Sequence, residues 1–172
     1  MQYLTRKEVG LIAESPLMVF SYEIGAFISA GIVGKEGGLF SHFMWYVGDG
    51  MVASQDKNYK IWSVDEYLSS CLLEFWYDPN WRDDQKAMLM SCIYEEVAQD
   101  KAFISYDVLA IIGQLTDQEW IQIPGFDICS DKGKYIASID PDYDLKKPSP
   151  ANVRRWLKNN ERYAIYGRYM PL

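Results

Sequence analysis

Short apolar runs divided by turn residues mark the expected strands of this chain. Leu17–Tyr22 and Leu72–Tyr77 are short and apolar, which is typical of buried strands. Phe40–Val47 and Met51–Gln55 flank a Gly-Asp-Gly tripeptide, and this pattern predicts a β-hairpin because glycine accepts the positive φ of a tight turn. Tyr163–Tyr169 predicts a closing strand.

Helical spacing of apolar residues is clearest over Arg82–Asp100. One stripe collects its apolar side chains, namely Met88, Leu89, Cys92, Ile93 and Val97. Further helices are expected over Met1–Ser15 and, as helix or turn, over Asp107–Leu115. Two more are expected over Ser63–Glu66, where Ser63 opens a capping box, and over Asp127–Ile139, where Asp127 is the N-cap. A last helix is expected from Ser149, with Pro150 in its first turn. Ile24–Gly38 fits either a helix and loop or a covering flap.

The order of these elements predicts an α+β fold, with several helices packed against an antiparallel sheet. The chain has 172 residues, enough for one substantial core, and we find no repeat or linker that divides it. Residues 1–172 are therefore expected to form a single domain.

The charge balance narrows the choice of partners. The chain carries 24 acidic and 17 basic residues, a net charge of -7, and no basic cluster. Duplex nucleic acid and anionic lipid both bind through Lys/Arg patches on a protein, so neither is expected as a partner. No run is long enough to span a bilayer, and Leu17–Phe20 is too short for a signal-peptide core. The protein is therefore expected to be cytoplasmic as synthesised, without membrane insertion.

The cysteines favour a role for only one of the three. Their odd number and lack of a CxxC pair argue against a disulfide framework and a structural zinc site, so no metal or cofactor is expected. Cys92 falls in the apolar stripe of its helix, and Cys71 lies between a helix and a strand, so both are interpreted as structural. Cys129 would lie in the first turn of a helix capped by Asp127, where the helix dipole favours a thiolate.

His42, the only histidine, is the candidate base for Cys129. Asp127 and Asp131 oppose formation of the thiolate, and a protonated His42 would supply the cation that is needed. A catalytic imidazole also needs an orienting group. A three-residue hairpin loop would place Ser54 and Asp56 on the His42 face, whereas a two-residue loop would place Gln55 there. Ser54 is preferred. A hydrogen-bonded structural histidine is the alternative.

With these residues in place, the chain resembles the circularly permuted papain-like hydrolases, which include NlpC-type cell-wall peptidases, YiiX-like proteins and lecithin:retinol acyltransferase-like proteins. The matching segments are LFSHFMWYVGDGMVAS, with His42 in the place of the base, and GFDICSDKGKYIASI, with Cys129 in the place of the nucleophile. Ser149–Val153 resembles the Pro-Ala turn that follows the cysteine helix, and Pro16–Phe20 the opening strand.

The resemblance implies a permuted papain-like fold and a thiol hydrolase that works through an acyl-enzyme. Cys129 would attack an amide carbonyl, His42 would shuttle the proton, and peptidoglycan stem peptides would be the leading substrate, ahead of lipid or protein acyl groups. A single domain without a signal peptide suits a phage or injected lytic protein. The family commonly has Glu or His in the place of Ser54, which implies a weaker orienting group here.

A second departure from the family is Asp131-Lys132-Gly133, which stands where relatives are mostly apolar. This difference predicts a more exposed or shorter catalytic helix.

Two other functions compete with the hydrolase. A non-catalytic binding protein would use the aromatic segments Phe43–Tyr46 and Phe75–Tyr77 as an interaction surface, and a zinc site would combine His42 with cysteines.

Overall fold

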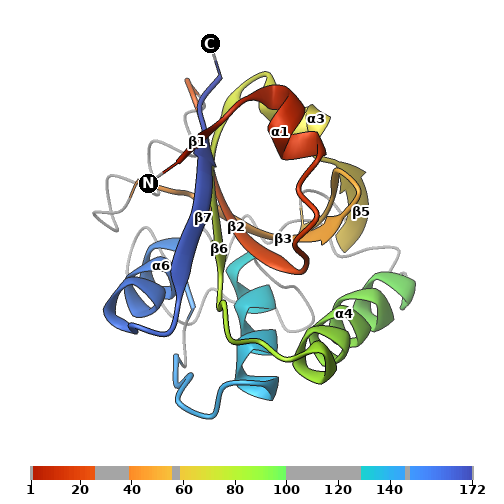
Figure 1. Ribbon diagram of the computed structural model, residues 1–172, viewed down its shortest axis with the longest axis vertical. Coiled ribbons are helices and arrows are strands. Elements are labelled where there is room, and N and C mark those ends of the chain that lie inside the picture. Colours follow the sequence, from red (N-terminus) through yellow and green to blue (C-terminus); the bar gives the residue numbers. More distant parts are fainter. Residues whose placement is uncertain (1, 26–38, 56–58, 100–128, 146–147, 172) are drawn as a thin grey trace, which may run out of the picture.

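The computed structural model describes residues 2–25, 39–55, 59–99, 129–145 and 148–171, without the side chains of residues 129–131. Within this part of the chain, seven strands form one sheet in the order β1-β7-β6-β2-β3-β4-β5 (Figure 1). The strands are β1 (Tyr3–Leu4), β2 (Leu17–Glu23), β3 (His42–Gly48), β4 (Met51–Gln55), β5 (Tyr59–Ser63), β6 (Cys71–Tyr77) and β7 (Ala164–Tyr169). All neighbouring strands are antiparallel except the short β1, which pairs with β7 in parallel. The expected α+β class is confirmed.

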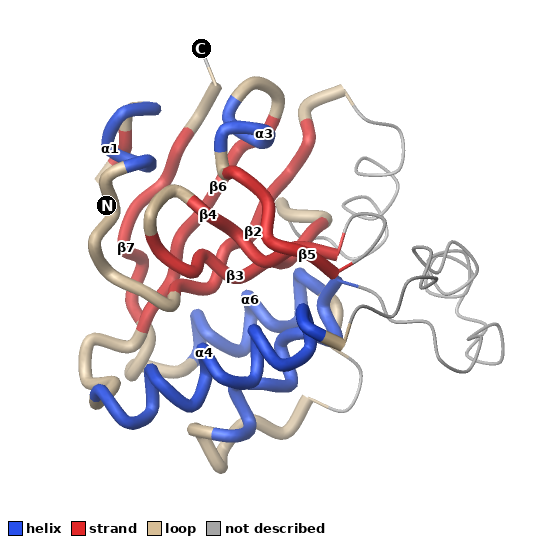
Figure 2. The backbone as a smooth tube through the Cα atoms, turned by 90° about the vertical axis from the view of Figure 1, so that its right-hand side faces the viewer, coloured by secondary structure: helices blue, strands red, loops and turns tan. Residues whose placement is uncertain are grey.

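Helices cover both faces of this sheet (Figure 2). They are α1 (Arg6–Gly10), α3 (Asp65–Leu68), α4 (Asp83–Ala98), the 3₁₀ helix η1 (Cys129–Ser138) and α6 (Pro150–Asn159). α1 and α3 pack on one face, which we call the α1/α3 face. α4, η1 and α6 pack on the other, the α4/α6 face. None of these described helices is long and apolar enough to cross a bilayer.

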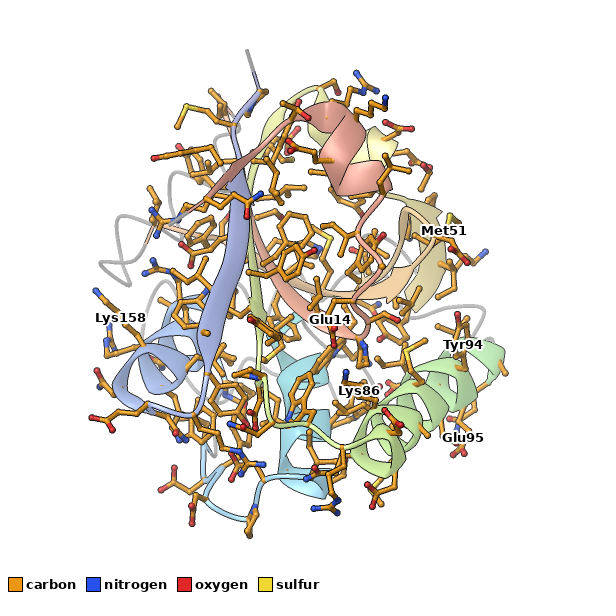
Figure 3. The ribbon with its side chains drawn as sticks, viewed as in Figure 1. Glu14, Met51, Lys86, Tyr94, Glu95 and Lys158 are labelled. Carbon is orange, nitrogen blue, oxygen red and sulfur yellow. The ribbon has the colours of Figure 1, made fainter. Side chains whose placement is uncertain are left out.

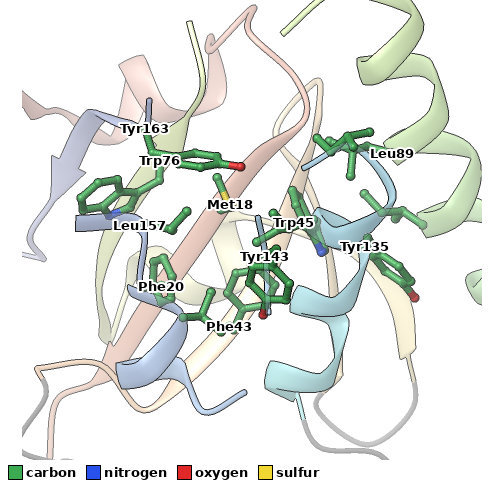
Figure 4. Packing of buried hydrophobic residues seen from close by; sticks show 14 of the residues in the cluster. Met18, Phe20, Phe43, Trp45, Trp76, Leu89, Tyr135, Tyr143, Leu157 and Tyr163 are labelled. Atoms are coloured by element: carbon green, nitrogen blue, oxygen red, sulfur yellow. The ribbon is translucent and has the colours of Figure 1, made fainter. Parts of the chain in front are cut away.

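Each face of the sheet has its own buried cluster. Figure 4 shows part of the cluster on the α4/α6 face, where Met18, Phe20 and Trp45 from the strands meet Leu89 of α4, Tyr135 of η1 and Leu157 of α6. On the α1/α3 face, side chains from the same strands pack against the short helices and include Leu17, Val19, Met44, Tyr46, Val9 and Leu68. Alternate residues of β2 and β3 therefore serve opposite cores, as the two-residue period of a strand requires.

The predicted strands and three of the six predicted helices, those observed as α4, η1 and α6, are confirmed close to their expected ends. α6 begins as expected, because the Ser149 hydroxyl accepts a hydrogen bond from the Asn152 amide at 3.2 Å and Pro150 opens the helix. α4 is further tied to the segment before β2 by the ion pair of Lys86 with Glu14, 2.6 Å between Nζ and Oε1 (Figure 3). Asp107–Leu115 and most of Ile24–Gly38 lie outside the described residues.

Three local predictions were wrong. The N-terminal helix is only Arg6–Gly10, because Thr5 and Glu8 form a capping box there and a short strand precedes it. The helix expected from Ser63 has Val64 at its N-cap and no side-chain cap, since Ser63 ends β5, a strand that was not predicted. Met88 of α4 is 49% exposed and not part of the buried stripe, which is formed by Leu89 and Ile93 with Cys92 and Val97 partly buried.

Candidate functional site

His42 and Ser54 form the part of the predicted site that the structure brings together. The Nε2 atom of His42 lies 2.8 Å from the Ser54 hydroxyl oxygen, a hydrogen-bonding distance. The side chain of Ser54 is fully buried and that of His42 is half-buried. A buried hydroxyl at this distance can hold the ring in one orientation, which is what an orienting residue must do.

The register of the β3–β4 hairpin explains why Ser54 contacts the histidine. Only Asp49 and Gly50 separate the two strands, a loop length that would by itself place Gln55 on the His42 face. A β-bulge between Tyr46 and Gly48 shifts the pairing by one residue, so that Met44 pairs with Ser54. The bulge therefore reverses the effect of the short loop, and Gln55 faces the other side of the sheet.

The turn that closes this hairpin has an unusual backbone. Gly48, Asp49 and Gly50 have φ angles of 100°, 50° and 69°, all in the left-handed region. Glycine tolerates these angles because it lacks a Cβ, and Asp is among the few other residues that do. The Gly-Asp-Gly tripeptide is therefore required by the turn and the adjacent bulge.

Cys129 is the first residue of η1, two positions after the expected cap Asp127, which lies outside the described residues. The side chain of Cys129 also lies outside the described part, as does Asp56. η1 is held to β3 by Trp45, whose indole Nε1 donates a 3.0 Å hydrogen bond to the Lys132 carbonyl. The Trp45 ring also packs against Tyr135, with 6.4 Å between centroids (Figure 4).

The contacts of η1 with the sheet lie at β3 and β5. Tyr135 packs against Trp45 in the middle of β3. The Lys132 ammonium lies 4.8 Å from the centroid of the Tyr59 ring, and Tyr59 pairs with Gln55 at the end of β4 that adjoins the start of β3. The main chain of Lys132 and the ring of Tyr135 thus both contact Trp45 in the middle of β3, and only the Lys132 side chain extends to Tyr59 of β5.

The alternation of β3 shows on which face of the sheet the His42 side chain lies. Phe43 and Trp45 belong to the cluster under η1, whereas Met44 and Tyr46 belong to the cluster on the α1/α3 face. His42 pairs regularly with Ser21, so strand alternation assigns it to the same side as Met44. A contact with η1 must therefore pass around the end of β3.

Lys132 and Gly133 are buried within η1, so the expectation of a more exposed helix after Cys129 was wrong at these positions. The Lys132 ammonium forms an ion pair with Glu96 of α4. A Cβ at Gly133 would lie 2.9 Å from the Tyr143 hydroxyl and 3.3 Å from a Val153 methyl group. The lysine thus replaces an apolar contact by a buried charge pair, and the glycine permits close packing of η1 on α6.

The other two cysteines behave as interpreted. Cys71 is buried with 6% of its surface exposed, and Cys92 is partly buried among the apolar residues of α4. Among the residues that the structure describes, no group of three or more His, Cys, Asp or Glu side chains could hold a metal ion.

Lys132 and Glu96 form a buried ion pair that the sequence pattern did not reveal. Lysine in a helix is ordinarily exposed, and these two residues are 36 positions apart, so no local pattern connects them. The only available signal is position, since Lys132 lies one 3₁₀ turn after Cys129.

No protein-family model matches the chain, and a search of curated proteins finds no match to it.

Proposed function

We propose that this domain is a thiol hydrolase of the permuted papain-like type, with Cys129 as nucleophile, His42 as acid–base and Ser54 as the residue that orients the imidazole. The hydrogen bond between His42 and Ser54 carries the proposal. A catalytic histidine needs such a contact to orient its ring. The contact depends on the β-bulge between β3 and β4, which brings Ser54 to the His42 face.

The Ser54 contact also assigns roles to the two ring nitrogens. Ser54 engages Nε2, so proton exchange with the thiol and the substrate would use Nδ1. In the imidazolium form Nε2–H donates to the hydroxyl oxygen, which stabilises the cation beside a thiolate. The hydroxyl can accept this bond without a charge of its own, which makes Ser54 a weaker partner than a carboxylate.

The proposed reaction has two steps. The Cys129 thiolate adds to the carbonyl carbon of an amide, and the C–N bond breaks as the His42 imidazolium gives its proton to the leaving amine. His42 then takes a proton from water, the hydroxide adds to the thioester carbon, and the C–S bond breaks to release the acid and the cysteine. The backbone N–H of Cys129 would help to hold the oxyanion in both steps.

Peptidoglycan stem-peptide amides are the proposed substrate class, on the strength of the family resemblance, with lipid or protein acyl groups second. The net charge of -7 is unfavourable for anionic surfaces and favours a neutral or cationic acyl donor. Release of new amino groups from purified peptidoglycan tests the first class, and hydrolysis of a thioester or ester of a long-chain acid tests the second.

Alkylation of Cys129 by iodoacetamide, followed by peptide mass spectrometry, tests the site independently of the substrate. We expect Cys129 to react faster near pH 6 than a free cysteine, whose pKa of about 8.5 leaves little thiolate there. His42→Ala should remove this advantage. Cys92, which is partly buried on α4, serves as the internal reference in the same digest. Equal rates for Cys129 in the wild type and His42→Ala would overturn the proposed dyad.

A non-catalytic binding domain is the second candidate, and strand alternation favours it. The aromatic surface expected for such a domain was wrong, because Phe43, Trp45, Tyr46, Phe75 and Trp76 are buried in the two cores. His42 starts on the Met44 side of β3, whereas η1 packs on the Trp45 side. In that case His42 and Ser54 would be a structural pair, and His42→Ala would lower stability without changing the alkylation rate of Cys129. The same pair of measurements therefore separates the two functions.

A further inference from the structure

Two arginine side chains share one buried carboxylate on the α4/α6 face of the sheet, and the reaction proposed above does not use them. Arg154 comes from α6 and Arg168 from β7, and both form ion pairs with Glu74 of β6. The Glu74 side chain is fully buried, whereas those of Arg154 and Arg168 are 19% and 20% exposed. The cluster thus joins a buried carboxylate to guanidinium groups that a ligand can reach from solvent.

The charges of this cluster do not balance. Arg154 donates to both carboxylate oxygens of Glu74, 2.5 Å from Nε to Oε1 and 3.2 Å from Nη2 to Oε2. Arg168 donates to the same Oε2 through its Nε and Nη2 atoms. The other side chain bonded to Glu74 is Trp76, whose indole is neutral. Among the described residues, two cations therefore share one anion, and one positive charge is left over.

Each guanidinium also keeps N–H groups that the carboxylate does not use. An arginine has five N–H donors. Glu74 accepts bonds from Nε and Nη2 of each arginine, and no other acceptor for either guanidinium is found in the described part of the chain. The Nη1 group and the second hydrogen of Nη2 are thus left to a ligand or to water in both residues.

Both guanidinium groups are held in place before any ligand binds. One edge of the Arg154 group is bonded to Glu74, and one of its faces lies on the buried Phe40 ring, 5.1 Å from Cζ to the ring centroid. Arg168 pairs with Glu74 across β6 and β7, and its backbone N–H donates a 3.0 Å hydrogen bond to the Gln2 carbonyl. Side chains that are already ordered lose little conformational entropy when they bind.

We propose that Arg154 and Arg168 form a binding site for a small oxyanion, in which a carboxylate or a phosphate group is recognised. The guanidinium fork matches both groups and binds them through pairs of N–H bonds. The two cations lie side by side, because both donate to Oε2 of Glu74, and an anion reduces their mutual repulsion. The net charge of -7 is unfavourable for an extended anionic surface, so the ligand is a small molecule.

This site is independent of the proposed hydrolase function. Glu74 pairs with Phe20, which belongs to the cluster on the α4/α6 face, whereas strand alternation assigns His42 to the Met44 side of the sheet. Anion binding is measured without any reaction of Cys129. A failure of the anion site therefore leaves the dyad untouched, and a failure of the dyad leaves the anion site untouched.

Calorimetric titration of the intact chain with inorganic phosphate, and separately with acetate, tests the site. Sodium chloride keeps the ionic strength constant, so that a general response to salt does not register as binding. We expect saturable binding of one anion per chain in the millimolar range or tighter. The anion with the higher affinity identifies the recognised group. No saturable binding of either anion in this range would overturn the proposal.

Arg168→Met removes the excess charge and leaves Glu74 its partner Arg154. We expect the affinity for the anion to fall about tenfold or more, because the charge-assisted hydrogen bonds of one guanidinium are lost. Arg155→Met is the matched control. It removes the same charge from the position next to Arg154 on α6, where the side chain donates to Asn152 at 2.9 Å, and the affinity should stay within about twofold of the wild type. Equal losses in the two variants would show an effect of overall charge and overturn the site.

Arg154→Lys is a second variant, which keeps the charge and a donor to Glu74 but replaces the planar fork by a single ammonium. We expect the affinity to fall about threefold or more, whereas Arg155→Lys should bind like the wild type. Circular dichroism shows which variants keep the native fold. Wild-type affinity in a natively folded Arg168→Met or Arg154→Lys protein would show that these arginines only support Glu74, and would overturn the proposal.

Discussion

Ser54 shows how a single buried hydroxyl can determine the state of a histidine. It has no exposed surface, and its oxygen lies 2.8 Å from Nε2 of His42. A buried polar group without a partner lowers the stability of the fold by about 1–3 kcal/mol, so each of these two residues stabilises the position of the other. The pair was predicted from the spacing of the hairpin, with Gln55 and Asp56 as alternatives.

Replacing Ser54 by Ala should therefore affect both stability and reactivity. We expect Ser54→Ala to lower the free energy of unfolding by about 1 kcal/mol, because Nε2 loses its partner, and to slow alkylation of Cys129 near neutral pH. Urea unfolding and the alkylation rate measure the two effects. Ser138→Ala, which removes a hydroxyl bonded to the Tyr135 carbonyl at the far end of η1, is the control for the rate. A wild-type rate in Ser54→Ala would exclude the orienting role.

Gly133 sets the distance between η1 and α6. Gly133→Ala would place a Cβ 2.9 Å from the Tyr143 hydroxyl and 3.3 Å from Val153, and we expect a loss of about 1–2 kcal/mol from this overpacking. Gly10→Ala is the control, since nothing lies within 4 Å of its Cβ position, and it should be neutral or slightly stabilising. Thermal unfolding of both variants measures the difference, and equal melting temperatures would contradict the close packing.

At the scale of elements, the β3–β4 hairpin brings His42 and Ser54 together. Its bulge and its left-handed turn depend on each other, since an added residue in one strand must be accommodated where the chain reverses. We expect Gly48→Ala to cost about 1–2 kcal/mol, because its φ of 100° is unfavourable for alanine. It should also slow Cys129 by weakening the register that pairs Ser54 with His42. A wild-type alkylation rate in a destabilised Gly48→Ala protein would contradict the dependence of the site on this turn.

A second device at this scale is the buried carboxylate of Glu74, which joins β6 to α6 and β7. Glu74 is fully buried, accepts a 2.6 Å hydrogen bond from the Trp76 indole, and forms ion pairs with Arg154 and Arg168. Burial alone would raise the pKa of Glu74, but the hydrogen bonds from Arg154 and Trp76 and the charges of both arginines outweigh it and lower the pKa.

The lowered pKa of Glu74 predicts the direction of the pH dependence. Its contribution to stability is complete above the pKa of an unfolded glutamate, about 4.3, and is lost as the pH falls through the lower value of the folded state. Glu74→Gln should cost about 2–4 kcal/mol at neutral pH, and its stability should fall less than that of the wild type on acidification. Urea unfolding between neutral and acid pH measures this. Asp84→Asn, in the exposed pair with Arg82, is the control and should change little.

At the scale of the whole molecule, one sheet separates two cores in the part of the chain that the structure describes. The strands β2, β3 and β6 contribute alternate residues to the cluster under α4, η1 and α6 and to the cluster under α1 and α3. Neither cluster can lose its packing while the shared strands stay intact. In the described part of the chain, the shared strands thus link the two clusters.

Unfolding should consequently be a single cooperative transition. Far-ultraviolet circular dichroism reports the sheet and helices, and tryptophan fluorescence is dominated by residues such as Trp45 and Trp76 in the cluster on the α4/α6 face. We expect the two signals to give the same urea midpoint, as for a two-state domain. Separate midpoints would show that the two faces unfold independently.

The sequence could predict those parts of the fold that depend on neighbouring residues. The hairpin around Asp49, the cap at Ser149 and the buried face of α4 have short-range signals, because turns, caps and helical stripes are formed by residues a few positions apart. The N-terminal helix was predicted too long, since its start depends on the capping box of Thr5 and Glu8, and β5, which pairs with β4, was not predicted.

For the candidate site, the sequence by itself determined which residues have the chemistry: one histidine, a cysteine at the expected start of a helix, and a serine in the returning strand. Only the tertiary structure decided which of them meet. The bulge selected Ser54 over Gln55, and the packing of η1 on α4 buried Lys132 against Glu96. The physical reason is that register and burial are set by contacts between segments far apart in the chain, to which local patterns of polarity and spacing do not respond.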